Sequence, residues 1–234
     1  MTLSNKNQND KLNFELAYSY NVEYNFSNTP LNRFNKSVTN HERLDLLKKL
    51  ENKISSIKDC KLKSNSSKIV FSDGNIFSDI MIVGEGPGAK EDELGKPFVG
   101  DAGILLNKML KAINIRRERI YITNVVNFRP PNNRKPEMDE INRYSIFLRE
   151  HISIINPKLI ILMGSTAMEA LFGNKAKISK ERGKWKEVII NTKTFLSIIT
   201  FHPAYLLRQP DQKKFSWIDL KIVKKKIEEL KIKI

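Results

Sequence analysis

Short apolar segments alternate with amphipathic ones along most of the chain. The apolar segments are rich in Ile, Leu and Val and are bounded by polar or turn residues, which is typical of β-strands. Six segments are predicted to be strands: 68–71, 79–83, 120–126, 158–163, 188–190 and 195–200. Because nearly every position in them is apolar, the sheet is expected to be buried on both faces.

Amphipathic segments predict the helices between these strands. Leu44, Leu47, Leu50 and Ile54 recur at the spacing of one helix face, which predicts a helix over 41–57. Similar patterns predict three further helices, over 101–113, 137–155 and 211–232. Strands that alternate with helices favour right-handed crossovers. The predicted fold class is therefore α/β, a three-layer α/β/α domain with a central, mostly parallel sheet of four to five strands.

The beginning of the chain has a different character. Residues 1–40 are rich in Asn, Ser and Lys, and their apolar residues keep no period. We expect 1–40 to be a loosely structured N-terminal arm with a short helix over 14–24. Residues 41–234 are expected to form the folded domain.

Composition adds a charge and a cysteine count. The chain of 234 residues has 41 Lys and Arg against 26 Asp and Glu, a formal charge of +15. This excess favours polyanionic partners, nucleic acid first, although a lysine-rich background composition accounts for it equally. The one cysteine cannot form an intrachain disulfide, and neither an apolar span of about 20 residues nor a secretory signal is visible. We therefore expect a cytoplasmic monomer that binds no membrane.

Polar or glycine-rich segments follow four of the predicted strands. They are 84–92, 127–134 together with Asn124, 164–166 and 201–208. The carboxyl ends of parallel strands meet at one edge of a sheet, and ligands bind there. These segments are therefore predicted to converge on one site.

The glycine-rich segment does not fit the common phosphate-binding loops. Gly95 and Lys96 are followed by Pro97, where a Walker A loop has Ser or Thr. Glu91 and Asp92 would repel a pyrophosphate at the position of a dinucleotide-binding loop. A nucleotide- or dinucleotide-binding enzyme is therefore excluded as an interpretation.

Residues near two of these strand ends each allow two interpretations. Phe98 lies among turn residues and is either part of the core or a stacking platform. His202 directly follows an apolar strand and is either a structural histidine or a catalyst. The apolar segment 205–207 fits a buried helical turn, or a wedge that enters a base stack beside a phosphate-binding Arg208.

Several separated motifs together resemble one known family, the family 4 (thermostable-type) uracil-DNA glycosylases. The motifs are 84–88 with Glu91, 95–100, 123–126 with 129–134, and 202–208. They occur in the family's order and at its spacing, and the similarity extends from about residue 41 to about residue 222. The resemblance implies the three-layer fold and hydrolysis of the N-glycosidic bond of flipped-out uracil in DNA, which starts base-excision repair.

The resemblance also implies roles for individual residues. Two are implied to be catalytic: Glu91 as the acidic residue, and His202 as the donor to uracil O2. Four are implied to bind the substrate: Glu85 and Gly86 at the pocket, Phe98 stacked on uracil, and Asn124 reading the uracil edge. Five are implied to contact DNA: Gly88, Gly164, Ser165, Leu206 as the wedge, and Arg208. Arg129 and Arg134 are further phosphate candidates.

The sequence departs from the family at its metal site. Family 4 enzymes typically hold a [4Fe–4S] cluster on four cysteines, whereas the matching positions here are Ile57, Cys60, Phe128 and Tyr144. One thiolate cannot hold such a cluster. We therefore predict no cluster and no metal, and expect these four side chains to gather in one patch held by packing.

Two alternatives to a strict uracil-DNA glycosylase stay open. Gly88 leaves room where a bulkier residue could exclude other bases, so a glycosylase for a wider range of deaminated bases is one alternative. A non-catalytic DNA-binding protein that retains the fold is the other. The expected partner is uracil-containing DNA, single- or double-stranded, in a bacterial cytosol or nucleoid.

Overall fold

The computed structural model describes residues 40–173 and 177–233. These residues belong to one compact unit of the chain, Thr39–Ile234. The predicted arm over 1–40 and its helix over 14–24 lie outside the described residues, apart from Asn40. The domain boundary therefore stays a prediction.

A six-stranded sheet forms the centre of the domain, in the order β1-β3-β2-β4-β6-β5. The strands are β1 (Asp73–Gly74), β2 (Ile80–Gly84), β3 (Tyr121–Asn124), β4 (Leu159–Met163), β5 (Trp185–Ile190) and β6 (Lys193–Thr200). Neighbouring strands from β3 to β6 run parallel, and β1 and β5 add an antiparallel strand at each edge. The predicted fold class is confirmed, and the two antiparallel edges raise the number of strands above the expected four to five.

One predicted strand is absent from this sheet. Residues 68–71 have an apolar pattern but are not assigned to a strand. The backbone N–H of Val70 donates to the carbonyl of Asn127 at 2.8 Å, and the Asn127 side chain donates to the Val70 carbonyl at 3.1 Å. The segment is thus fixed by contacts with a loop, which an apolar pattern cannot distinguish from pairing with a strand.

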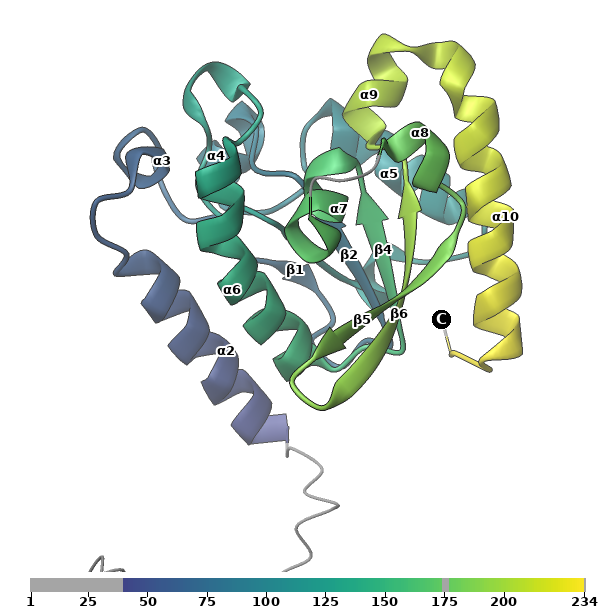
Figure 1. The fold of residues 1–234 in the computed structure, drawn as a ribbon, viewed down its shortest axis with the longest axis horizontal. Coiled ribbons are helices and arrows are strands. Elements are labelled where there is room, and N and C mark those ends of the chain that lie inside the picture. Colours follow the sequence, from purple (N-terminus) through teal and green to yellow (C-terminus); the bar gives the residue numbers. More distant parts are fainter. Residues whose placement is uncertain (1–39, 174–176, 234) are drawn as a thin grey trace, which may run out of the picture. The chain divides into compact units, whose positions relative to one another are not determined.

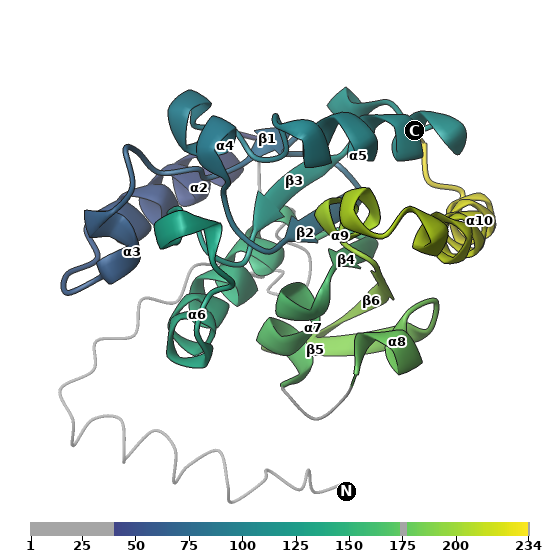
Figure 2. The same cartoon turned by 90° about the horizontal axis from the view of Figure 1, so that it is seen from above.

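Helices cover both faces of the sheet (Figures 1 and 2). They are α2 (Asn40–Ser55), α3 (Lys61–Ser64), α4 (Ala89–Leu94), α5 (Asp101–Ala112), α6 (Met138–Ile155), α7 (Ser165–Phe172), α8 (Ile178–Glu181), α9 (Pro203–Arg208) and α10 (Lys213–Glu229). Apolar side chains of α2, α6 and α7 pack in one core, and those of α5, α9 and α10 pack in a second core on the opposite face. The three layers follow from strands that are apolar on both faces.

The predicted long helices are present with small changes at their ends. The helix expected over 211–232 is shorter, because a 3-10 turn at Pro210–Gln212 precedes α10. Among the residues that the structure describes, no helix has the length and apolar character needed to cross a membrane.

A buried ion pair fastens α10 to the sheet. Asp219 of α10 is fully buried and accepts a hydrogen bond from Arg182 Nε at 3.1 Å. It also accepts one from the hydroxyl of Thr200, the last residue of β6, at 2.8 Å. The guanidinium of Arg182 lies over the ring of Phe201, 5.6 Å from its centroid. Asp219 therefore joins the last helix to the strand end that leads into His202.

Candidate active site

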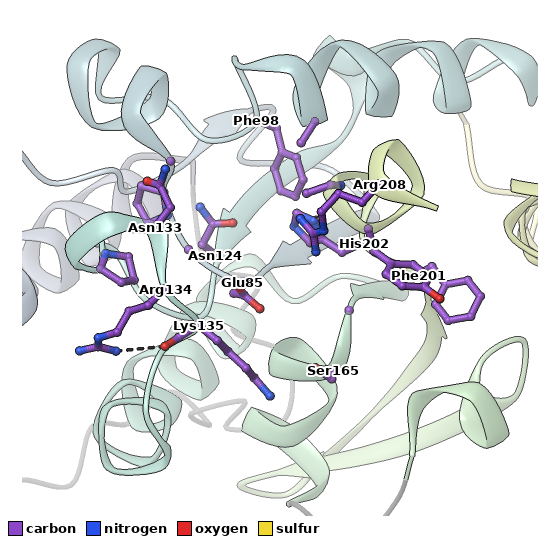
Figure 3. Close-up of a pocket in the computed structure, with 18 of the residues that line it drawn as sticks. Glu85, Phe98, Asn124, Asn133, Arg134, Lys135, Ser165, Phe201, His202 and Arg208 are labelled. Carbon is purple, nitrogen blue, oxygen red and sulfur yellow. Dashed lines mark hydrogen bonds between the residues drawn. The ribbon is translucent and has the colours of Figure 1, made fainter. Parts of the chain in front are cut away.

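A cavity of about 810 Å³ opens at the carboxyl ends of the parallel strands. Its lining includes every site residue predicted from the sequence except Leu206 and the phosphate candidate Arg129: Glu85, Gly86, Gly88, Glu91, Phe98, Asn124, Arg134, Gly164, Ser165, His202 and Arg208. Figure 3 shows the labelled side chains arranged around this space. The predicted convergence of four strand ends on one site is confirmed.

Glu91 joins two loops that line the cavity. Its carboxylate accepts backbone N–H bonds from Gly88 at 3.2 Å, Val99 at 3.0 Å and Gly100 at 2.8 Å. A Cβ atom at Gly88 would lie 2.8 Å from Glu91 Oε2. Both carboxylate oxygens therefore accept hydrogen bonds from the backbone of the cavity loops. The catalytic role implied for it stays a prediction.

Glu85 is the carboxylate that remains more open to the cavity. It follows β2, is half-buried, and accepts a hydrogen bond on Oε2 from the hydroxyl of Thr166 at 2.5 Å. Figure 3 shows its side chain at the centre of the site. The sequence alone does not predict this role of Thr166, because a threonine near a helix start shows no pattern that identifies its hydrogen-bond partner.

Phe98 is held in a strained backbone conformation beside the site. Its φ angle is +53°, in the left-handed region that few non-glycine residues adopt. Arg117 donates to the carbonyls of Pro97 at 2.7 Å and Phe98 at 3.1 Å, and its guanidinium pairs with Asp73 at 2.8 Å. These bonds hold the loop that presents the aromatic ring.

Gly84, at the end of β2, makes room for two of the cavity side chains. A Cβ atom on this residue would lie 2.6 Å from the Phe98 ring and 2.4 Å from Asn124 Oδ1. Asn124 ends β3 and is 4% exposed, and none of the described residues makes a hydrogen bond with its side-chain amide. The absence of a side chain at Gly84 thus allows the ring and the amide to lie side by side.

His202 presents a nitrogen without a partner to this space. It is the N-cap of α9, and its Nδ1 accepts the backbone N–H of Ala204 at 3.2 Å. This bond assigns the hydrogen to Nε2. Nε2 is buried and finds no hydrogen-bond partner in the described part of the chain. The imidazole ring stacks against Phe98, with centroids 5.4 Å apart.

The electrostatics keep His202 neutral. Burial, with a smaller contribution from the positive charge of Arg208, lowers the pKa of His202 to about 4. At pH 7 the ring is therefore uncharged and can donate one hydrogen bond from Nε2. Such a group stabilises an oxyanion without first losing a proton.

The cationic side chains at the rim of the cavity differ in whether they are paired with a carboxylate. Arg134 forms two hydrogen bonds with Glu140, at 2.7 and 2.8 Å, and this pairing raises the pKa of Arg134. Lys135 pairs with Glu169 at 2.8 Å. Arg208 is exposed and pairs with no carboxylate among the described residues. Of the cations at this rim, Arg208 is therefore the one best suited to bind a phosphate.

Leu206 is placed differently from the wedge implied by the resemblance. It is 1% exposed and packs in the core shared by α5, α9 and α10, whereas Leu207 is 43% exposed. Successive helix residues are rotated by about 100°, so a helix that turns Ala204 to the cavity turns Leu206 roughly 200° away. The side chain of Leu206 is thus turned into the core, its wedge role stays a prediction, and Leu207 is the exposed leucine of α9.

The four positions that hold cysteines in the family belong to one apolar region. Cys60, Phe128 and Tyr144 are buried in a single core, and Ile57 packs against it. Cys60 Sγ lies 3.3 Å from the hydroxyl of Tyr144. We call these four residues the packed patch. Their donor set of one thiol and one phenol does not fit a four-thiolate cluster. No group of three or more His, Cys, Asp or Glu is placed to hold a metal ion within residues 40–173 and 177–233.

Comparison with known proteins identifies the family. Residues 71–224 match the model of the uracil DNA glycosylase superfamily. The chain is 42% identical over 169 residues to the type-4 uracil-DNA glycosylase of Thermotoga maritima, covering 72% of this chain and 86% of that protein. It is 41% identical over 197 residues to the protein of the same name from Sulfurisphaera tokodaii, covering 81% and 86%. The resemblance in the motifs is thereby confirmed, and the chain belongs to the type-4 family of the uracil-DNA glycosylase superfamily.

Proposed function

We propose that this protein is a uracil-DNA glycosylase, which hydrolyses the N-glycosidic bond of a uracil flipped out of DNA and so starts base-excision repair. The observation that carries the proposal is one cavity shared by the Phe98 ring, the Asn124 amide and the unpartnered Nε2 of His202. An aromatic face, an amide and a ring N–H are suitable groups to hold and read an extruded pyrimidine. The relatives named above carry this activity in their names.

The chemistry assigns a task to each side chain. Breaking the bond leaves uracil as an anion, and neutral His202 donates to O2, where negative charge grows as the bond breaks. Asn124 offers a donor and an acceptor, which match O4 and N3–H of uracil, whereas cytosine presents the opposite pattern. Phe98 covers one face of the base.

The two carboxylates of the site, Glu85 and Glu91, have different roles. The sugar gains positive character as uracil leaves, and a water molecule must then attack it. Glu91 uses both oxygens on backbone N–H groups, whereas Glu85 is held through Oε2 by Thr166. We therefore assign the orientation of water and the stabilisation of the sugar to Glu85. Glu91 positions the loops on which Gly88 and Gly100 lie.

Release of free uracil from a single-stranded oligonucleotide tests the function. We expect release by the wild type and a loss of rate on the order of 10²–10⁴ in Glu85→Gln, with its melting temperature unchanged. Glu91→Gln should lower the melting temperature and the rate together, because three backbone N–H groups lose a charged acceptor. Binding of DNA without any release by the wild type would support the non-catalytic alternative.

Gly88 supports a second candidate function, a glycosylase for several deaminated bases. The backbone at this position bounds the cavity without a side chain. Oligonucleotides with hypoxanthine or xanthine in place of uracil distinguish the two activities. Release of these bases at rates near that of uracil would support the broader activity, and release of uracil alone would exclude it.

The partner is DNA, and three finer points extend this proposal. We expect single- and double-stranded DNA both to be substrates, because recognition is centred on one extruded nucleotide. We expect a monomer, because the residues of the site all come from one chain. We place the enzyme in a bacterial cytosol or nucleoid, where its DNA substrate would lie.

We also propose that the enzyme works without an iron–sulfur cluster. The support is the packed patch, in which side chains occupy the positions of the family's ligands. Protein purified without oxygen should contain no stoichiometric iron or sulfide and should release uracil at full rate. Four irons per chain, lost together with activity on chelation, would overturn this proposal.

A further inference from the structure

A second, shallower cavity of about 420 Å³ lies between α10 and the end of α5. Ala112 and Ile113 form its side on α5. The side on α10 consists of Trp217, Lys221, Lys224, Lys225 and Glu228. We call these seven residues the α10 groove. None of them belongs to the catalytic cavity.

The spacing of the α10 residues places an aromatic ring and three lysines on one face. Lys221, Lys224 and Lys225 follow Trp217 by four, seven and eight residues, which is the repeat of a single helix face. The adjoining face, with Leu220, Val223 and Ile227, packs in the core. Trp217 is 44% exposed, an unusual setting for so large an apolar side chain outside a binding surface.

The lysines of the groove are not held in ion pairs. Lys221, Lys224 and Lys225 form no ion pair with any carboxylate in the described residues, and Glu228 is the one acidic residue that lines the groove. Lys226, on another side of the same helix, is paired with Glu229 at 2.5 Å and lies over the ring of Trp185. The groove therefore carries a net positive charge around an exposed aromatic ring.

The groove follows the catalytic cavity closely along the chain. Gln212 lines the catalytic cavity and immediately precedes α10, and Trp217 follows it by five residues, about 7.5 Å along a helix. Lys213 and Lys214, which are exposed, lie between the two. Figures 1 and 2 show α9 leading into α10 at this end of the domain. A strand of DNA that leaves the cavity past Arg208 and Gln212 would pass Lys213 and Lys214 and turn about 140° around α10 to reach Trp217, because successive helix residues are rotated by about 100°.

We propose that the α10 groove binds the single-stranded DNA that flanks the uracil, with Trp217 stacked on a base and the three lysines on phosphates. Stacking on an aromatic ring needs an unpaired base, and every base offers such a face. Lysines spaced along the same path bind the phosphates without reading sequence. This inference rests on the proposed function, because it supplies the path by which the substrate enters.

Binding of DNA without uracil tests the groove separately from catalysis. Affinity for a fluorescent 21-nucleotide oligo(dT) is measured for the wild type, Trp217→Ala, Trp217→Phe, and the triple variant Lys221→Gln, Lys224→Gln, Lys225→Gln. We expect about tenfold weaker binding by Trp217→Ala and near wild-type binding by Trp217→Phe. The triple variant should flatten the slope of log affinity against log salt by about 2, because about 0.7 is lost per phosphate contact.

A matched control removes the same charge from another face. Lys48, Lys49 and Lys58 are exposed on or just after α2, which packs on the opposite side of the sheet. Their replacement by Gln should change the affinity and the salt slope much less than the groove variant does. An equal change in both triple variants, or unchanged affinity in Trp217→Ala, would overturn the proposal.

Uracil release from oligonucleotides of two lengths completes the test. The groove variants should raise KM for a 21-nucleotide substrate about tenfold with kcat unchanged, and should leave a five-nucleotide substrate unaffected. Tighter competition by poly-glutamate than by oligo(dT) would assign the groove to an acidic protein and overturn the proposal. If the wild type binds oligo(dT) through the groove but releases no uracil, the proposed function fails while the groove assignment stands.

Discussion

The catalytic cavity and the packed patch treat polar groups in opposite ways. In the cavity, His202 Nε2 is buried, and neither it nor the Asn124 amide has a hydrogen-bond partner among the described residues. In the packed patch, the polar atoms of Cys60 and Tyr144 contact each other, and hydrocarbon fills the remaining volume. Groups that must meet a substrate are left unsatisfied at a cost in stability, whereas positions that only hold the fold together can exchange their chemistry.

The largest effect is expected from opening a hole in the packed patch. Phe128 is 4% exposed, so Phe128→Ala should reduce the free energy of unfolding by about 3–5 kcal/mol. Urea denaturation measures this loss, and Ile146→Ala, at a residue that is 64% exposed, serves as the control. Uracil release by the folded fraction should stay near the wild-type rate. A folded but inactive variant would show that the patch contributes to catalysis.

His202→Ala should reduce activity with little change in stability, the reverse of Phe128→Ala. Loss of the Nε2 donor should slow uracil release on the order of 10²–10³. The free energy of unfolding should change little, because removal of an unsatisfied buried group offsets the loss of the N-cap bond to Ala204. Single-turnover kinetics provide the measurement, with His41→Ala, on an exposed histidine, as the control. A wild-type rate of uracil release in His202→Ala would show that His202 is not the hydrogen-bond donor to uracil O2.

A smaller loss of activity is expected when a side chain is added in the catalytic cavity. Gly84→Ala places a methyl group 2.6 Å from the Phe98 ring, so overpacking of about 1–3 kcal/mol should lower kcat/KM roughly 10- to 100-fold. Gly173→Ala is the control, because none of the described residues lies within 4 Å of its added Cβ and its φ of +78° adds only strain. Equal activity in both variants would mean that the ring and the amide move aside without loss.

A further prediction concerns acid stability. Burial lowers the pKa of His202 to about 4 and that of His151, which bonds to Tyr121, to about 3. Both pKa values lie below the ordinary 6.5, so the unfolded chain binds more protons in this range. Stability should therefore be complete above pH 6.5 and should decrease as the pH falls towards 4. His202→Ala should reduce this dependence, and an unchanged pH profile of unfolding would contradict the prediction.

Features that depend on hydrophobic periodicity and on the order of the elements along the chain could be predicted from the sequence. The apolar runs at β2, β4 and β6 predicted a parallel sheet, and this implied that the loops after them meet at one edge. The motifs then placed Phe98, Asn124 and His202 in a common site, where the cavity has them. Each of these inferences needed only local pattern and the geometry of a sheet.

Features that depend on side-chain partners or on helix phase could not be predicted. The rotation of α9 about its axis, which buries Leu206, is set by packing against α5 and α10. The sequence predicts Arg134 as a phosphate-binding residue, but its guanidinium is hydrogen-bonded to Glu140. Segment 68–71 has the apolarity of a strand, but its partner is a loop. In each case the deciding contact comes from a part of the chain that the local pattern does not include.

The bond between Asp219 and Arg182 limits how far the protein can be shortened. Deleting α10 would remove the carboxylate that holds Arg182 over Phe201, next to His202, and would uncover the core that Leu220, Val223 and Ile227 close. Exposure of so much apolar surface is strongly destabilising. A minimal version of the enzyme must therefore retain this final helix, even though its outer surface looks like a dispensable lysine-rich appendage.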